Sequence, residues 1–126
     1  MAQGRVRADH GDAVQNNIVH LQGRVSAVDE PRQLPSGDAV VTFRVIVRRP
    51  ASRSRNRPKD DLAPRTQVDT IDVACWSATT RRTAGRLGAG DVVEVDGALR
   101  RRFFRAGGGA ASRYEVEAHR VKRVSA

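Results

Sequence analysis

The most distinctive chemistry of this sequence lies in Arg100–Arg105, where four arginines surround Phe103 and Phe104. A guanidinium group is a planar fork that contacts a phosphate bidentately and stacks on flat rings. An aromatic ring exposed among arginines makes a poor core residue and a good platform for a nucleic-acid base. Neighbouring residues of a strand face opposite sides, so we expect one phenylalanine to pack inward and the other to be exposed. The candidate binding residues here are Phe103, Phe104, Arg100, Arg101, Arg102 and Arg105.

Trp76, the only tryptophan, is a second candidate for base stacking. It is out of phase with Ile71, Val73 and Cys75, which form the apolar row of the same predicted strand. An outward tryptophan on a small barrel requires a partner, which is either a base or a protein surface such as a helix or a subunit interface. The arginine-rich segment has a comparable alternative, because its charges would also keep a projecting hairpin soluble.

A third group of arginines belongs to the second predicted strand, residues 39–49. Arg44 and Arg48 share the row opposite the apolar one, and Arg49 ends the strand. These arginines make the strand more cationic than solubility alone requires. Phe43 and Tyr114 are in phase with the apolar rows of their strands, so we expect both to pack in the core. Residues 50–67 carry no apolar period and predict a long basic loop, a kind of segment that is often functional.

Residues suited to catalysis or metal binding are sparse. A zinc site needs three or four well-placed cysteine, histidine or carboxylate ligands, whereas the chain has one cysteine and three scattered histidines. The sequence contains no GxxxxGK[ST] phosphate loop. Cys75 is in phase with its apolar neighbours, so we expect it to pack in the core and not to act as a reactive thiol. The sequence predicts a protein that is not an enzyme and that needs no metal or cofactor.

The composition points to a polyanionic partner. The chain has 126 residues and a formal net charge of +9, and only Lys59 and Lys122 of its 23 basic residues are lysines. This balance suits nucleic acid or an anionic membrane surface. The sequence has no run of 18 apolar residues and no apolar segment near its start, so we expect no membrane insertion and a cytoplasmic location.

Alternating apolar and polar residues predict five strands, at about 19–27, 39–49, 68–77, 91–105 and 114–119. Residues 79–87 suit one or two helical turns that end at Gly88, and Gly97 predicts a bulge or bend in the fourth strand. A glycine-rich loop, residues 106–111, precedes the last strand. Five strands with one helix between the third and the fourth is the element order of the OB-fold, an all-β, five-stranded Greek-key barrel. We expect a flexible tail at 1–16, one domain at 17–124, and a C-terminal end at 125–126.

Four pieces of the sequence, in order and with matching spacing, resemble the bacterial single-stranded DNA-binding proteins. The pieces are Asn17–Val25, Pro31–Val45, Asp72–Trp76 and Leu87–Arg100. The resemblance extends from residue 17 to residue 124. It implies an OB-fold that binds single-stranded DNA without sequence preference, protecting it during replication, recombination or repair. It also implies self-association, as a homotetramer or else a homodimer.

The same resemblance assigns roles to individual aromatics. Trp76 looks like the family aromatic at the end of the third strand, and Phe104 looks like the one at the end of the fourth. Two further family positions, near Ala51 and at Thr70, are not aromatic here. The resemblance therefore implies a heavier reliance on arginine for binding.

The end of the chain differs from the family's main replication protein, which usually carries a long tail with an acidic tip that recruits partner enzymes. This sequence ends at Val121–Ala126 without acidic residues, so we expect a DNA-holding role without that recruitment, as in a shortened or accessory paralogue or a truncated chain. A second class of function stays open at this point. A primosome-like or RNA-binding OB-fold module, in which protein contacts dominate, would share the same elements.

Overall fold

The computed structural model describes residues 15–50 and 67–125. The elements are β1 (Val19–Val28), β2 (Arg32–Gln33), β3 (Ala39–Arg48), β4 (Val68–Cys75), α1 (Ala78–Ala84), β5 (Val92–Ala106) and β6 (Gly109–Ser125). The tail predicted for residues 1–16, the basic loop predicted for 50–67, and Ala51 fall largely or wholly outside the described residues. No helix in the described part of the chain is long and apolar enough to cross a membrane.

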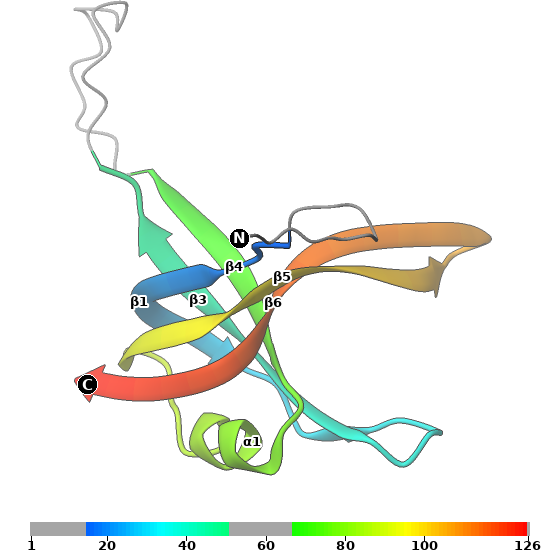
Figure 1. Ribbon diagram of the computed structural model, residues 1–126, viewed down its shortest axis with the longest axis horizontal. Coiled ribbons are helices and arrows are strands. Elements are labelled where there is room, and N and C mark those ends of the chain that lie inside the picture. The colour runs from blue at the N-terminus through cyan, green and yellow to red at the C-terminus, as the bar shows by residue number, and fades with distance from the viewer. Residues whose placement is uncertain (1–14, 51–66, 126) are drawn as a thin grey trace, which may run out of the picture.

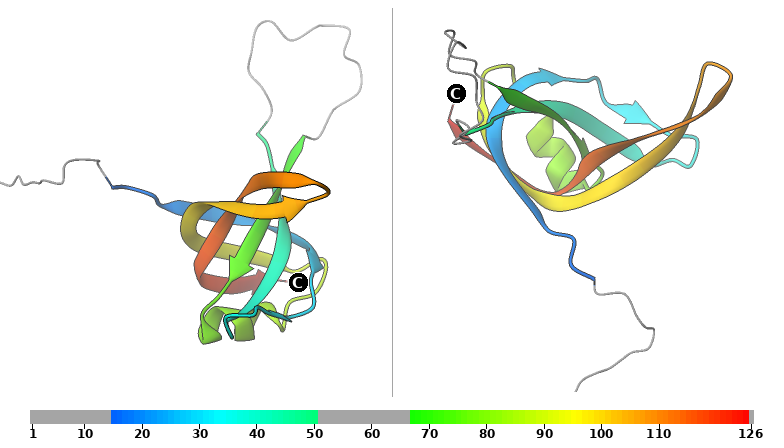
Figure 2. Two further views of the ribbon diagram at one scale, coloured as in Figure 1. Left: turned by 90° about the vertical axis from the view of Figure 1, so that its right-hand side faces the viewer. Right: turned by 90° about the horizontal axis from the view of Figure 1, so that it is seen from above.

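The strands form one sheet that closes on itself as a barrel (Figures 1 and 2). The strand order is β1-β5-β6-β4-β3-β2, and β1 also pairs with β3, which joins the two sides of the sheet. All pairings are antiparallel except the short parallel contact between β4 and β6. The predicted OB-fold class is confirmed, with the two-residue β2 as an addition that alternation alone does not reveal.

Two glycines allow the barrel to close. A Cβ at Gly23 would lie 2.4 Å from the carbonyl oxygen of Ile46, at the point where β1 passes from β5 to β3. A Cβ at Gly97 would lie 2.0 Å from the carbonyl oxygen of Glu117, where the register of β5 against β6 shifts. Only glycine permits such close backbone approach. The bulge predicted at Gly97 is therefore confirmed.

The barrel interior is filled mainly by valines, whose β-branched side chains pack well on a pleated surface. Phe43 and Cys75 are fully buried among them, as predicted. Helix α1 covers one end of the barrel, as the view from above shows (Figure 2). Ser77 caps the helix by accepting a hydrogen bond from the backbone N–H of Thr80 at 3.1 Å. Gly85 ends the helix, three residues before the predicted stop at Gly88.

Beyond the barrel, β5 and β6 continue together as a long two-stranded arm, residues 99–115 (Figure 1). Its tip is a two-residue turn at Gly107 and Gly108, whose φ angles of 52° and 109° suit the left-handed conformations that tight hairpins require. The predicted glycine-rich loop is thus mostly strand. Most arm residues are exposed because the arm leaves the core behind.

The arm corrects two predictions about aromatic residues. Phe103 is 71% exposed and Phe104 is 40% exposed, so neither packs into the core. Tyr114 is 59% exposed, although it continues the apolar row of its strand. The physical reason is the same in all three cases. Alternation places a residue on one side of a sheet, but beyond the barrel neither side of the sheet faces a core.

Candidate nucleic-acid interface

The arm has two faces of different chemistry, which the β5–β6 register defines. Arg102 lies directly opposite Arg113, and Arg101 lies directly opposite Tyr114. Because successive side chains alternate between faces, the even-numbered residues of β5 share one face with the odd-numbered residues of β6. We call this the Trp76 face, because Trp76 contacts it: it comprises Arg100, Arg102, Phe104, Arg113 and Glu115. The opposite side is the Phe103 face: Leu99, Arg101, Phe103, Arg105 and Tyr114.

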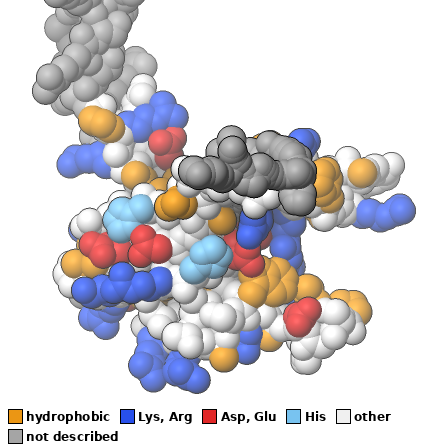
Figure 3. Space-filling view, viewed as in Figure 1, with side chains coloured by type: hydrophobic (Ala, Val, Ile, Leu, Met, Phe, Trp, Pro, Cys, Tyr) orange, Lys and Arg blue, Asp and Glu red, His pale blue; other side chains and the backbone are white. Residues whose placement is uncertain are grey.

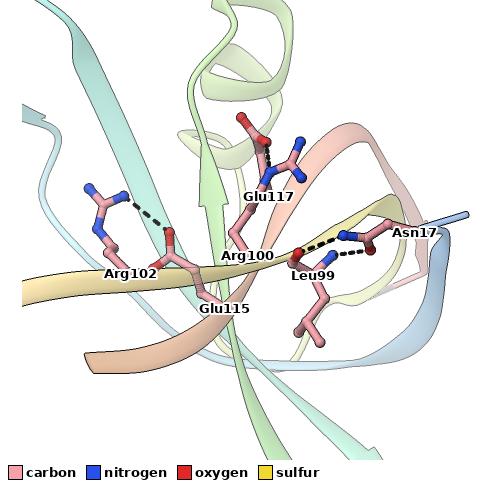
Figure 4. A network of polar contacts seen from close by, with 6 residues as sticks. All are labelled: Asn17, Leu99, Arg100, Arg102, Glu115 and Glu117. Carbon is pink, nitrogen blue, oxygen red and sulfur yellow. Dashed lines mark hydrogen bonds and ion pairs between the residues drawn. The ribbon is translucent and has the colours of Figure 1, made fainter. Parts of the chain in front are cut away.

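On the Trp76 face, Arg102 contacts both an aromatic ring and a carboxylate. Its guanidinium carbon lies 4.9 Å from the centroid of the Trp76 ring. Its Nη1 lies 3.4 Å from Oε2 of Glu115, a side chain that is only 3% exposed (Figure 4). A cation over an aromatic face is attracted by the ring quadrupole, and the carboxylate fixes the other side of the same group.

Trp76 itself is held from the backbone. It follows the last residue of β4 and precedes Ser77, the N-cap of α1. Its carbonyl oxygen accepts a hydrogen bond from the guanidinium of Arg81, which lies on α1. The indole is partly buried, so the predicted outward position is correct but the ring does not stand free in solvent.

Two further arginines of this face are also engaged within the protein. Nε of Arg100 donates to Oε1 of Glu117 at 2.7 Å, across the ladder (Figure 4). Arg113 lies over the ring of Phe104, with 5.5 Å between guanidinium carbon and ring centroid. Arg102 and Arg113 lie opposite each other in the ladder, but they contact different aromatic rings.

The Phe103 face carries aromatics without carboxylates. Arg101 lies 5.2 Å from the ring centroid of Phe103 and 5.6 Å from that of Tyr114. Its Nε donates to Oγ of Ser112 at 3.1 Å. Within residues 15–50 and 67–125, Arg101 forms no ion pair.

Asn17 secures the base of the arm. Its side-chain amide donates to the carbonyl oxygen of Leu99 and accepts from the backbone N–H of Leu99, both at 2.8 Å (Figure 4). Asn17 continues the β1–β5 register, in which Val19 pairs with Gly97. The side-chain amide thus replaces the backbone pairing that would come next.

Two arginines on or just after β3 are neutralised by aspartates of β4. Nε of Arg44 lies 3.2 Å from Oδ1 of Asp72, and Nη2 of Arg49 lies 2.7 Å from Oδ1 of Asp69. The hydrogen bond from Arg49 lowers the pKa of the Asp69 carboxyl, so this ion pair persists to a lower pH. The visible face of the barrel shows basic and acidic side chains interspersed, with no single continuous basic surface (Figure 3).

Comparisons with known proteins identify the family. A family model described as the single-strand binding protein family matches residues 16–124. This chain belongs to the single-strand binding protein family. A curated relative, a single-stranded DNA-binding protein of Oceanobacillus iheyensis, is 30% identical over 88 residues. That match covers 70% of this chain and 50% of the relative, so the chain spans about half the length of the relative.

A solved structure shares the fold of this single-strand binding family member. It is described as a Plasmodium falciparum SSB complex with ssDNA, and it matches with a TM-score of 0.69 and 19% identity. The match covers 92% of this chain and 99% of that one. The predicted family and the predicted OB-fold are both confirmed. The family is named for binding and not for a reaction, in agreement with the prediction that the protein is not an enzyme.

The structure divides the predicted site residues of this family member into three groups. The residues that meet on the Trp76 face are Trp76, Phe104, Arg100 and Arg102. The residues on the Phe103 face are Phe103, Arg101 and Arg105. The residues on β3 or just after it are Arg44, Arg48 and Arg49. The sequence reasoning missed Arg113 and Glu115 as parts of the site. The sequence signal for both would have been the register of the hairpin, which the consecutive glycines Gly107–Gly109 leave open.

The remaining reactive groups lie apart from the arm. Burial raises the pKa of the Cys75 thiol to about 11, so the thiol stays protonated and unreactive at neutral pH. Among the described residues, no group of three or more histidine, cysteine, aspartate or glutamate side chains is placed to hold a metal ion. Nδ1 of His20 donates to Oδ1 of Asp96 at 2.5 Å on the β1–β5 surface.

Proposed function

We propose that this protein binds single-stranded DNA without sequence preference and protects it during replication, recombination or repair. The observation that carries the proposal is the series of guanidinium–aromatic contacts along the arm: Arg102 with Trp76, Arg113 with Phe104, and Arg101 with Phe103 and Tyr114. Stacking platforms beside cations suit any base, because every base has a flat π-face. Membership of the single-strand binding family supports the same conclusion.

The proposed binding surface is the arm together with the end of β3. We propose that Phe104 and the pair formed by Trp76 and Arg102 supply the stacking surfaces. We also propose that phosphates contact arginines of this surface with no carboxylate partner in the described part of the chain. Those arginines are Arg48, Arg101, Arg105 and Arg113. Four such contacts would give a slope of about −3 in log affinity against log salt, from about −0.7 for each phosphate.

Arg44, Arg49 and Arg100, which the sequence analysis also selected, have a different role in this proposal. Each already donates to a carboxylate, so a phosphate would have to compete with Asp72, Asp69 or Glu117. We propose that they shape the surface and contribute less to affinity.

The test is a titration with four labelled ligands of equal length: single-stranded DNA of two unrelated sequences, the matching duplex and the matching RNA. We expect similar, tight binding to both single strands and at least tenfold weaker binding to the duplex. Tighter binding to RNA, or no preference for single strands, would favour an RNA-binding or primosome-like module instead. A flat response to salt would contradict the electrostatic part of the proposal.

The proposal also includes an oligomeric state and a cellular location. Self-association as a homotetramer, or else a homodimer, follows from the family resemblance, and sedimentation velocity with and without DNA measures it. A cytoplasmic site of action follows from the expected partner, DNA, and fluorescence microscopy of a tagged chain in its host tests it.

A further inference from the structure

The ring of Trp76 is not vacant: a guanidinium already contacts its face. Arg102 lies 4.9 Å from the ring centroid while its Nη1 lies 3.4 Å from the carboxylate of Glu115. A base that stacked directly on this side of the indole would have to displace Arg102 first.

Displacing Arg102 would be costly because of Glu115. This carboxylate is 3% exposed, and Arg102 is its side-chain partner among the described residues. Removing one partner of a buried ion pair leaves an uncompensated charge, which is strongly unfavourable. The arrangement therefore favours keeping Arg102 in place when a ligand arrives.

Arg102 is itself suited to receive a base. Its side chain remains 29% exposed, so part of the group that covers the indole is open to solvent. A guanidinium is flat and weakly hydrated, and it stacks on planar rings while its edge keeps hydrogen bonds to a carboxylate. Arg113 stands opposite Arg102 in the ladder and adds positive charge close to the phosphate that such a base would bring.

We infer that Arg102, and not Trp76, is the surface on which a base stacks at this position, and that Glu115 is its positioning residue. Trp76 then supports the guanidinium from beneath. The inference rests on the proposed function, since it names the group that touches the base of a bound single strand.

The test compares Arg102→Lys, Glu115→Gln and the matched control Glu117→Gln in titrations with an oligothymidylate. Arg102→Lys keeps the charge but removes the flat surface, so affinity should fall roughly tenfold, the usual worth of one stack. Glu115→Gln should weaken binding to a similar extent. Glu117→Gln removes the same negative charge but releases Arg100, which contacts no aromatic ring in the described residues, so it should not weaken binding.

Trp76 fluorescence provides a second readout that a merely structural role would not move. The emission of the parent protein should change little on saturation with DNA, because the base meets Arg102. In Arg102→Ala the indole is uncovered, so its emission should be quenched by whatever DNA still binds. Thermal melts of each variant show that the barrel is folded.

Two results would overturn the inference while leaving the proposed function intact. One is that Arg102→Lys binds as tightly as the parent. The other is that Arg102→Ala binds more tightly and the parent emission is strongly quenched, which would make Arg102 a displaceable cover of Trp76. If the parent itself shows no preference for single strands over duplex, the proposed function fails, and the inference fails with it.

Discussion

The two faces of the arm differ in how their arginines are held. On the Trp76 face, Arg100 and Arg102 are paired with Glu117 and Glu115, so the charge of the face is largely balanced and its side chains are fixed. On the Phe103 face, Arg101 and Arg105 form no ion pair with another described residue. One face is thus preorganised and the other is more strongly charged.

This difference indicates that the two faces contribute differently to base stacking and to phosphate binding. Stacking depends on geometry, and a fixed guanidinium or ring loses little conformational entropy when a base arrives. Phosphate attraction depends on net charge and tolerates mobile side chains. We therefore expect base contacts to concentrate on the Trp76 face and sequence-independent electrostatic contacts to depend more on the Phe103 face.

The largest expected difference between the faces is in stacking. Phe104→Ala should reduce the affinity for single-stranded DNA by about 1–3 kcal/mol, the usual worth of a base–aromatic stack. Phe103→Ala, the matched change one residue away on the opposite face, should cost less than about 0.5 kcal/mol by the same reasoning. Fluorescence anisotropy with an oligothymidylate measures both, and equal losses would remove the distinction between the faces.

A smaller difference concerns charge. The double variant Arg101→Ala with Arg105→Ala should reduce the salt slope by about 1.4, from two phosphate contacts of about 0.7 each. The double variant Arg44→Ala with Arg49→Ala serves as control, since both arginines are paired with aspartates of β4. If the control lowers the slope as much as the arm variant does, the barrel wall and not the arm attracts the phosphates.

The attachment of the arm to the barrel can be tested through Asn17. Asn17→Ala removes two hydrogen bonds to the backbone of Leu99. It should lower the free energy of unfolding by about 1 kcal/mol, because hydrogen bonds of exposed groups contribute near the low end of the usual range. Gln22→Ala, at an exposed position of β1, should change the free energy of unfolding by less than about 0.5 kcal/mol. Urea denaturation compares the two variants, and equal stability would show that Asn17 does not secure the arm.

The smallest expected effect lies away from the arm, at His20. Its hydrogen bond and ion pair with Asp96 raise the pKa of His20 above 6.5 and lower the pKa of Asp96 below 3.8. The charge of Glu94 adds to the rise in the His20 pKa, and the charge of Arg120 opposes that rise. The stabilisation from His20 is present below pH 6.5 and is lost as pH rises through the raised pKa. The contribution of Asp96 is present above pH 3.8 and is lost as pH falls through the lowered pKa.

Both groups are exposed, so the effect on stability should be slight. An NMR titration of the His20 ring measures the raised pKa directly. In Asp96→Asn the pKa of His20 should return towards 6.5, while DNA affinity stays unchanged. A His20 pKa that does not respond to this substitution would show that the ion pair is not formed in solution.

The fold was predictable from the sequence because valines alternate with polar residues along every long strand, and that period is what a closed barrel demands. Gly97 predicted the bend in the fourth strand, whereas the close approach at Gly23 emerged only from the structure. The point at which the arm leaves the barrel was not predictable in the same way, because alternation continues unchanged through Phe103 and Tyr114 although the core has ended. A strand pattern identifies the two sides of a sheet and does not tell where the sheet leaves the barrel.

The site was predictable only in part for a related reason. The aromatic and arginine residues were identifiable by type, but their pairing depends on the register of β5 against β6. Three consecutive glycines, Gly107–Gly109, allow more than one two-residue turn, and each choice would give Arg102 a different neighbour. The turn at Gly107 and Gly108 places Arg102 opposite Arg113, with Glu115 two residues further along the same face, and sequence alone could not settle this register.

The most direct test of the account is to map where a bound single strand lies. Single-stranded DNA that carries 5-iododeoxyuridine is crosslinked to the protein by light, and the attached residues are identified by fragmentation mass spectrometry. The account predicts attachment at Phe104 on the Trp76 face, with Phe103 and Tyr114 labelled weakly. Attachment mainly at Phe103 and Tyr114, or only at residues outside the arm, would contradict it.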